Sequence, residues 1–300
     1  MDMLARQDTP KLLRPFRMKS EAARTLVAGT CGGCASILVC HPLDTIRTRL
    51  QTAAPGEYAG AWDCAVASVR AEGVAALYKG LLVPLLAQGA YKAIMFGVYG
   101  ACRRRVTEST GRSELEPSEI FACGAFAGGA NALVLTPVEL VRNRLQVARS
   151  AGLTVAGALA DAAKAAGGSR LRGAYRGVCA TLLRDVPGVG AYYAAFEIAR
   201  RAAVARRGPG AVLSLPELAA AGAAGGAAFW TVALPFDCVK SRLQVGQGTS
   251  TWATLAATVR AGGLPALYVG YGSALVRGVP GAAVVFAVYG SVEARLREDS

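Results

Sequence analysis

The sequence predicts an all-α membrane protein with six transmembrane helices, arranged as three pseudo-symmetric repeats of two helices. Two observations predict this fold. Six windows approach the roughly 20 predominantly apolar residues that a helix needs to cross a hydrocarbon core of about 30 Å, and one charged motif occurs three times along the chain. A hydrophobic content of 53% fits a large soluble core as well as a membrane protein, so the windows decide between them.

The six windows alternate along the chain between two kinds. The uncharged windows are residues 25–40, 121–138 and 218–236. The windows that contain isolated ionisable residues are 81–102, 177–196 and 271–288. We therefore divide the chain into a tail, residues 1–20, and three repeats, residues 21–105, 106–205 and 206–300, which together form a single domain. Amphipathic stretches between the windows, such as 61–70 and 252–260, predict short helices along one membrane surface.

Composition excludes several classes of protein. The net charge of +13 is scattered at the ends of the windows, which indicates anchoring to anionic lipid and not nucleic-acid binding. The eight cysteines lack the paired spacing of a zinc site, and His41 is the only histidine. We therefore expect no metal site and no cofactor. Because the chain also lacks a nucleotide-binding loop and paired catalytic carboxylates, we do not expect an enzyme.

Each copy of the repeated motif closes one of the uncharged windows. The copies are HPLDTIRTRLQ at 41–51, TPVELVRNRLQ at 136–146 and LPFDCVKSRLQ at 234–244. Their prolines, Pro42, Pro137 and Pro235, remove a backbone donor and should kink the helices. An acid and a base three residues apart share one helix face. These pairs are Asp44 and Arg47, Glu139 and Arg142, and Asp237 and Lys240.

These six charges should form a ring inside the bundle. A charged side chain in hydrocarbon costs about 2.5–3.5 kcal/mol on insertion scales, so charges at one depth should face inward and pair with one another. A ring that breaks and reforms acts as a gate. Hydrogen bonds from Gln51, Gln146 and Gln244 should lie beneath it. The alternative is that these are ordinary helix-end charges held at a membrane interface.

Two further features recur in each repeat. Glycines four residues apart in the uncharged windows predict close helix packing: Gly29 and Gly33, Gly124 and Gly128, and Gly222 and Gly226. A second marker begins each of the other windows: Tyr78-Lys79-Gly80, Tyr175-Arg176-Gly177 and Tyr268-Val269-Gly270.

The repeated motif resembles the signature of the mitochondrial carrier family, P-x-[DE]-x-x-[KR]-x-[KR], followed by an aromatic residue, a base and a glycine. The resemblance implies a multi-pass protein of the mitochondrial inner membrane that works as a monomer, with short helices and the ring, its matrix gate, on the matrix side. It pairs Asp44 with Arg142, Glu139 with Lys240, and Asp237 with Arg47. It also implies bound cardiolipin at the second markers. The residues concerned are Lys79, Gly80, Arg176, Gly177 and Gly270, the last beside Val269 in place of a base.

The family's second, cytoplasmic gate is incomplete in this sequence. Its pattern of aromatic residue, acid, two residues and base is complete only at Phe196-Glu197 with Arg200. Arg103 has no acid three residues before it, and Glu293 stands where a base belongs. The resemblance therefore implies a weak gate formed by Arg103, Glu197, Arg200 and Glu293.

Four ionisable residues lie deep in the other windows and are candidates for substrate binding: Lys92, Arg184, Asp185 and Arg277. Arginine would bind a carboxylate, and Asp185 an amino or quaternary ammonium group. The alternatives are snorkelling of the long side chains to the interface and mutual neutralisation of Arg184 and Asp185.

The substrate motifs are similar to two branches of the family. Arg184-Asp185-Val186-Pro187 and Arg277-Gly278-Val279-Pro280 are similar to the ornithine and acylcarnitine branch, whereas Tyr91-Lys92 is closer to glutamate or carboxylate carriers. The resemblance implies transport by alternating access of a carboxylate-bearing metabolite, namely an ornithine-like or glutamate-like amino acid or carnitine and its esters. A di-/tricarboxylate or keto-acid exchanger is the alternative. An alternative of another class is a carrier-fold scaffold or receptor without transport.

Overall fold

The six apolar windows each overlap one long helix. The computed structural model describes residues 21–54, 56–112, 114–148, 153–208 and 213–298, so the tail at 1–20 lies outside the described residues. The long helices are α1 (Glu21–Thr52), α3 (Leu82–Thr110), α4 (Pro117–Val147), α7 (Val178–Arg207), α8 (Leu215–Gln244) and α10 (Tyr271–Glu298). The connecting elements are α2 (Ala61–Glu72), η2 (Val74–Tyr78), α5 (Val155–Ala165), α6 (Arg170–Ala174), α9 (Thr251–Gly262) and η3 (Leu264–Tyr268). No strand occurs among the described residues, and the all-α prediction is confirmed.

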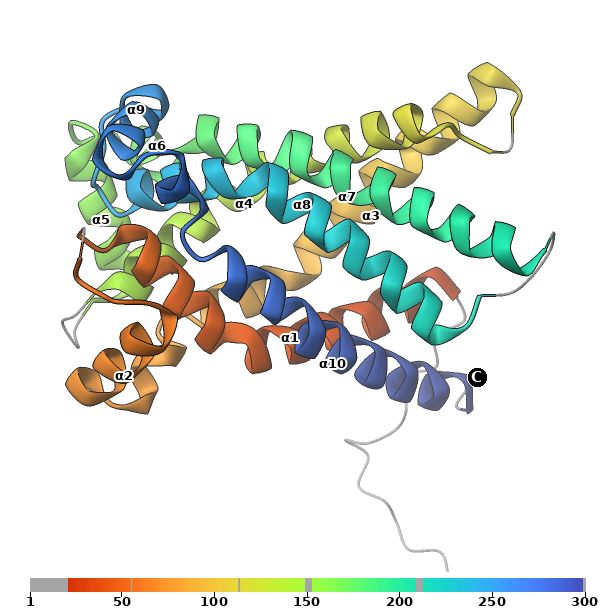
Figure 1. Cartoon of the computed structure of the whole chain (residues 1–300), viewed down its shortest axis with the longest axis horizontal. Coiled ribbons are helices and arrows are strands. Elements are labelled where there is room, and N and C mark those ends of the chain that lie inside the picture. Colours follow the sequence, from red (N-terminus) through yellow and green to blue (C-terminus); the bar gives the residue numbers. More distant parts are fainter. Residues whose placement is uncertain (1–20, 55, 113, 149–152, 209–212, 299–300) are drawn as a thin grey trace, which may run out of the picture.

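The long helices form a closed ring of neighbours. Helix α1 packs against α3, α3 against α4, α4 against α7, α7 against α8, α8 against α10, and α10 returns to α1. The short helices α2, α5, α6 and α9 gather at one end of this bundle, on the left in Figure 1. The C-terminus lies at the opposite end. We call these the short-helix end and the terminal end.

The long helices differ in how apolar they are. Four described segments have both the length and the composition to cross a membrane: Arg24–Thr52, Val74–Thr110, Pro117–Val147 and Pro216–Gln244. Helices α7 and α10 are 30 and 28 residues long, which at about 1.5 Å per residue also exceeds the hydrocarbon thickness. They complete the ring of six, with α7 between α4 and α8 and α10 between α8 and α1.

Close packing of α4 on α7 depends on the predicted glycines. A Cβ atom at Gly128 would lie 2.4 Å from the carbonyl oxygen of Asp185, and one at Gly124 would lie 3.0 Å from that of Val189. Only a residue without a side chain lets the two backbones approach this closely.

The same pattern is wrong for α8. A Cβ atom at Gly222 or Gly226 would meet nothing within 4 Å, whereas one at Gly225 would lie 2.9 Å from the carbonyl oxygen of Tyr192. Helix α8 therefore turns a different face toward α7 than the four-residue spacing predicts.

Candidate functional site

Each repeated motif lies near the short-helix end of its long helix. Pro42, Pro137 and Pro235 are inside α1, α4 and α8, and each helix continues beyond its proline through the glutamine of the motif. The acid and the base of each motif therefore project from neighbouring turns of one helix.

Three ion pairs join the acid of one motif to the base of another. Their closest atoms are Arg142 Nη2 and Asp44 Oδ2 at 2.8 Å, Lys240 Nζ and Glu139 Oε2 at 2.8 Å, and Arg47 Nε and Asp237 Oδ2 at 3.8 Å. These are the pairs that the family resemblance implies, and the third is looser than the other two. We call the six side chains the ion-pair ring.

A second layer of hydrogen bonds lies beside the ion-pair ring. The second base of each motif donates from Nε to the backbone carbonyl of the glutamine in another motif: Arg49 to Gln146 at 3.0 Å, Arg144 to Gln244 at 2.7 Å, and Arg242 to Gln51 at 2.8 Å. Our sequence reasoning did not single out these arginines, although the base recurs in every copy of the motif.

The glutamine side chains also join neighbouring motifs. Oε1 of Gln146 accepts a hydrogen bond from Thr48, that of Gln244 accepts one from Asn143, and that of Gln51 accepts one from Ser241. Gln51 reaches the ring itself, because its Nε2 donates to Asp237 Oδ2 at 3.0 Å.

Helix α7 brings Arg184 into the ion-pair ring. Arg184 Nε lies 2.6 Å from Asp185 Oδ1, and its Nη1 lies 3.1 Å from Asp237 Oδ1. Its Nη2 lies 2.9 Å from Glu139 Oε1. The arginine is only partly neutralised by its own neighbour, and it joins α7 to both α4 and α8.

Helix α10 contributes Arg277 in a similar way. Its Nε lies 2.8 Å from Asp44 Oδ1, and the side chain remains 31% exposed. Two of the predicted substrate residues therefore contact acids of the ring directly.

Lys92 is placed differently. Its ammonium lies 5.7 Å from the centre of the Tyr91 ring and 5.6 Å from that of Phe96. The structure does not bring it into contact with Arg184 or Arg277. Tyr91 itself lies within electrostatic range of both arginines and of Asp185. Tyr91 entered the sequence prediction only as part of the Tyr91-Lys92 motif, because a tyrosine in an apolar window gives no distinctive signal.

At the terminal end, Glu197 is bound by its own helix. Arg200 Nη2 lies 2.6 Å from Glu197 Oε1, and Arg201 Nε lies 2.7 Å from the same oxygen. Arg103, another predicted member of this gate, is not paired with Glu197 in the described part of the chain. An aromatic contact joins α3 to α7 instead, with the rings of Tyr99 and Tyr193 stacked 4.1 Å apart.

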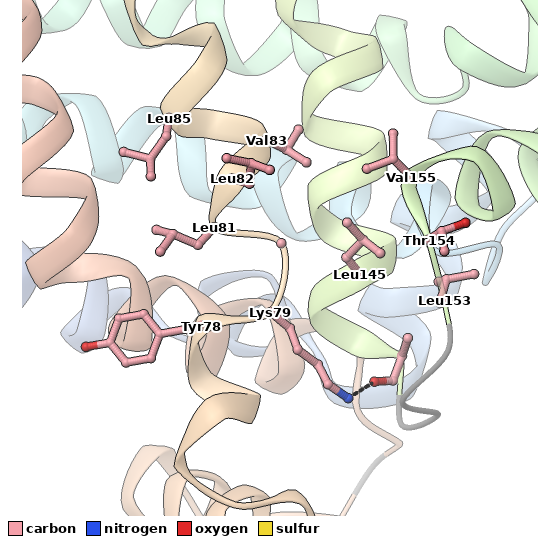
Figure 2. Close-up of a pocket in the computed structure, with 12 residues that line it drawn as sticks. Tyr78, Lys79, Leu81, Leu82, Val83, Leu85, Leu145, Leu153, Thr154 and Val155 are labelled. Atoms are coloured by element: carbon pink, nitrogen blue, oxygen red, sulfur yellow. Dashed lines mark hydrogen bonds between the residues drawn. The ribbon is translucent and has the colours of Figure 1, made fainter.

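A pocket of about 500 Å³ lies beside the first of the second markers (Figure 2). Gly80, at the start of α3, and Thr154, the N-cap of α5, both line it. Lys79 extends across the pocket and donates to the carbonyl of Ala148 at 2.8 Å (Figure 2). Its Nζ also lies 2.5 Å from Glu72 Oε2.

The other two markers differ from the first. Arg176 donates to the backbone carbonyls of Leu243 and Gly248, and Gly177 is the N-cap of α7 with a positive φ of 83°. At the third marker, a Cβ atom on Gly270 would lie 2.9 Å from Cγ of Arg47.

Comparisons with known proteins agree with this arrangement. The chain matches the family described as "Mitochondrial carrier protein" over residues 19–110, 113–206 and 212–300. It is 35% identical to "Mitochondrial magnesium exporter 1" of Drosophila melanogaster, over 89% of this chain and 93% of the relative. It is 34% identical to "Mitochondrial carnitine/acylcarnitine carrier-like protein" of Arabidopsis thaliana (90% and 97%) and 35% identical to "Mitochondrial basic amino acids transporter" of Bos taurus (93% and 96%). The chain therefore belongs to the mitochondrial carrier family, whose members transport small metabolites across the inner mitochondrial membrane.

Proposed function

We propose that this carrier transports a small carboxylate-bearing metabolite, either an amino acid or carnitine and its esters, with the ion-pair ring as its matrix gate. The contact of Arg184 and Arg277 with acids of the ring carries this proposal. A substrate whose carboxylate binds a guanidinium of this cluster competes directly with the gate. Its binding energy then favours the conformation in which the ring is open.

The chemistry of the cluster supports a zwitterionic or anionic substrate. A guanidinium binds a carboxylate through two parallel hydrogen bonds, and Asp185 supplies a partner for an ammonium group. A dibasic substrate would need a second acid in the cluster. The middle of α3 supplies none, because the acidic residue of that helix, Glu108, lies in its last turn. A glutamate-like or carnitine-like substrate therefore fits better than an ornithine-like one.

The name of the Drosophila relative raises the alternative of a divalent cation. Magnesium prefers carboxylate oxygens. In this carrier the acids Asp44, Glu139, Asp185 and Asp237 are all paired with arginine or lysine. No group of three or more His, Cys, Asp or Glu side chains fit to hold a metal occurs among the described residues. We therefore favour an organic substrate.

A dicarboxylate exchanger is the second candidate. It is favoured by the five bases that surround four acids in the cluster: Arg47, Arg142, Lys240, Arg184 and Arg277 against Asp44, Glu139, Asp237 and Asp185. A second carboxylate would neutralise the excess cation.

We propose cardiolipin as the lipid partner and a monomer as the working unit. The starts of α3 and α5 both lie at the pocket of Figure 2, and helix N-termini bind phosphate. One chain closes the ring of six helices by itself. Cardiolipin added to the purified carrier should raise its melting temperature more than phosphatidylcholine does, whereas equal shifts would contradict a specific lipid site.

A thermal-shift screen followed by uptake tests the transport proposal. Selective binding to the native state raises apparent stability. We expect L-glutamate, L-carnitine or acetyl-L-carnitine to stabilise the purified carrier and to be taken up by proteoliposomes. Stabilisation by dicarboxylates alone would favour the second candidate. Binding without uptake would indicate a scaffold or receptor.

A further inference from the structure

We infer that the carboxylate of the substrate binds between Arg47 and Arg277, in a corner next to Trp230, and thereby takes Arg47 away from the matrix gate. This inference rests on the proposed function and assigns the carboxylate to one side of the cluster. It also gives Arg47, a member of the ion-pair ring, a second role as a ligand of the substrate.

All three guanidinium nitrogens of Arg184 already donate to carboxylates. Its Nε and Nη2 donate to Asp185, its Nη1 donates to Asp237, and its Nη2 also donates to Glu139. Three carboxylates thus surround one buried guanidinium. A fourth carboxylate brought to Arg184 would meet repulsion from these three.

Around Asp44, in contrast, several bases surround one acid. Arg142 Nη2 lies 2.8 Å from Asp44 Oδ2. Arg277 Nε lies 2.8 Å and Arg47 Nη2 lies 4.0 Å from the other oxygen, Oδ1. Three guanidiniums share one carboxylate here, so this side of the cluster attracts an anion.

Arg47 has hydrogen-bond donors to offer a ligand. Its Nε is 3.8 Å from Asp237 Oδ2, which is beyond hydrogen-bonding distance. The oxygens of Asp237 accept hydrogen bonds from Gln51 and Arg184 instead. Neither Nε nor Nη1 of Arg47 has a hydrogen-bond partner among the described residues, although the side chain is only 11% exposed. Buried donors of this kind carry a desolvation penalty that an anion would remove.

Trp230 holds the guanidinium in place for this role. The Cζ atom of Arg47 lies 4.4 Å from the centre of the indole ring, the geometry of a cation–π contact. A planar guanidinium stacked on an aromatic face is oriented before the ligand arrives, so less conformational entropy is lost on binding.

Arg277 is the more solvent-exposed of the two arginines that form the corner. Its side chain is 31% exposed, whereas those of Arg47 and Arg184 are 11% and 10% exposed. Arg277 and Arg47 already reach toward the same oxygen of Asp44, so a substrate carboxylate beside that oxygen accepts from both. Arg47 then exchanges its loose contact with Asp237 for the substrate, which weakens the ring between α1 and α8.

Arg47→Lys tests this assignment. Lysine keeps the positive charge opposite Asp237 but loses the forked donors and their stacking on Trp230. The matched control is Arg112→Lys, which makes the same change at ion pairs with Glu116 and Glu119, outside the cluster. The probes are L-glutamate, L-carnitine, acetyl-L-carnitine and L-ornithine, titrated by thermal shift against the purified full-length carrier.

We expect Arg47→Lys to weaken binding of the stabilising probe about 10- to 100-fold, the effect of losing one charge-assisted hydrogen bond. Arg112→Lys should bind the probe as tightly as the unaltered carrier. Equal affinity of Arg47→Lys and the unaltered carrier would overturn the assignment and leave the proposed function intact. If none of the four probes stabilises the unaltered carrier, both proposals are wrong.

Fluorescence provides a second measurement should Arg47→Lys fail to fold. The other tryptophans, Trp62 and Trp252, are 83% and 62% exposed, so replacing both with phenylalanine leaves Trp230 as the sole tryptophan. A carboxylate bound to Arg47 beside the indole should change the emission of Trp230 in proportion to the bound probe. A probe that stabilises this variant without changing its emission would place the carboxylate elsewhere.

Discussion

Arg184 binds three carboxylates at once, and this determines how the cluster responds to mutation. Its nitrogens lie 2.6 Å from Asp185, 3.1 Å from Asp237 and 2.9 Å from Glu139. Arg184→Gln would leave these buried acids short of a cation, and breaking a buried pair costs about 3–5 kcal/mol. We expect a large fall in the apparent melting temperature of the variant, measured in detergent without added ligand.

Arg277→Gln is the matched control for that change. Arg277 is more exposed, and its partner Asp44 keeps Arg142 at 2.8 Å. The fall in melting temperature should therefore be smaller. Equal falls for the two variants would contradict a central role of Arg184 in holding the cluster together.

Glu72 links two bases at the short-helix end, outside the membrane-spanning helices. Burial raises the pKa of Glu72, but hydrogen bonds from Arg49 and Lys79 outweigh this effect and hold its pKa below the usual range. The stabilisation is therefore complete above the unfolded pKa of about 4.3 and is lost as the pH falls through the lower, folded pKa.

Glu72→Gln should remove this dependence on pH. We expect its melting temperature to lie below that of the unaltered carrier at about pH 7 and to approach it below about pH 4, where the carboxylate becomes protonated. Melting curves recorded across this range provide the measurement. A difference that stays constant with pH would show that the charge of Glu72 contributes nothing.

The sequence predicted the members of the ring better than their additional partners. Spacing of three residues places Asp44 and Arg47 on one helix face, and threefold repetition places all six charges at one depth. The contacts of Arg184 and Arg277 with the ring could not be predicted in this way. Helix position sets the depth of an arginine, whereas its long side chain has many rotamers, and the folded bundle selects one of them.

At the scale of elements, the α4–α7 interface provides a matched pair of glycines. A Cβ atom at Gly128 would lie 2.4 Å from the backbone oxygen of Asp185, so the helices must separate to admit it. At Gly129 the nearest atom would be Cγ2 of Val186 at 3.4 Å, an ordinary contact. Alanine also stabilises a helix relative to glycine by about 0.5–1 kcal/mol.

We therefore expect opposite effects from the two alanine substitutions. Gly128→Ala should lower the apparent melting temperature, and Gly129→Ala should leave it unchanged or raise it. Both variants can be compared with the unaltered carrier in one thermal-unfolding experiment. A stable Gly128→Ala variant would mean that α4 and α7 have room to separate at this position.

Elements were predictable where apolar length or amphipathic period marks them. The six windows correspond to the long helices, and the stretches at 61–70 and 252–260 correspond to α2 (Ala61–Glu72) and α9 (Thr251–Gly262). Glycine spacing was a weaker guide, because it holds for Gly124 and Gly128 but not in α8. Spacing identifies residues on one face of a helix, but the neighbours of that face depend on how the whole bundle is packed.

On the scale of the whole molecule, the two ends of the bundle are bonded differently. Ion pairs, and hydrogen bonds from arginines to the backbone carbonyls of glutamines, link α1, α4 and α8 at the short-helix end. At the terminal end, Glu197 is bound by Arg200 and Arg201 of its own helix, so its charge does not hold α7 to a neighbour. The ion pairs between the three motif helices therefore lie at the short-helix end.

Amide hydrogen exchange should report this asymmetry. Amide hydrogens exchange slowly in segments that rarely open. Residues 139–146 of α4 should therefore be better protected than residues 101–110 of α3. Combining Glu139→Gln with Asp237→Asn removes the charges that hold Arg184 and two of the ring's bases, Lys240 and Arg47. The double variant should exchange faster at 139–146 and at an unchanged rate at 101–110. Glu197→Gln is the control, because its effect should stay at the terminal end. Faster exchange at both ends in the double variant would mean that the ring stabilises the whole bundle and does not act as a local gate.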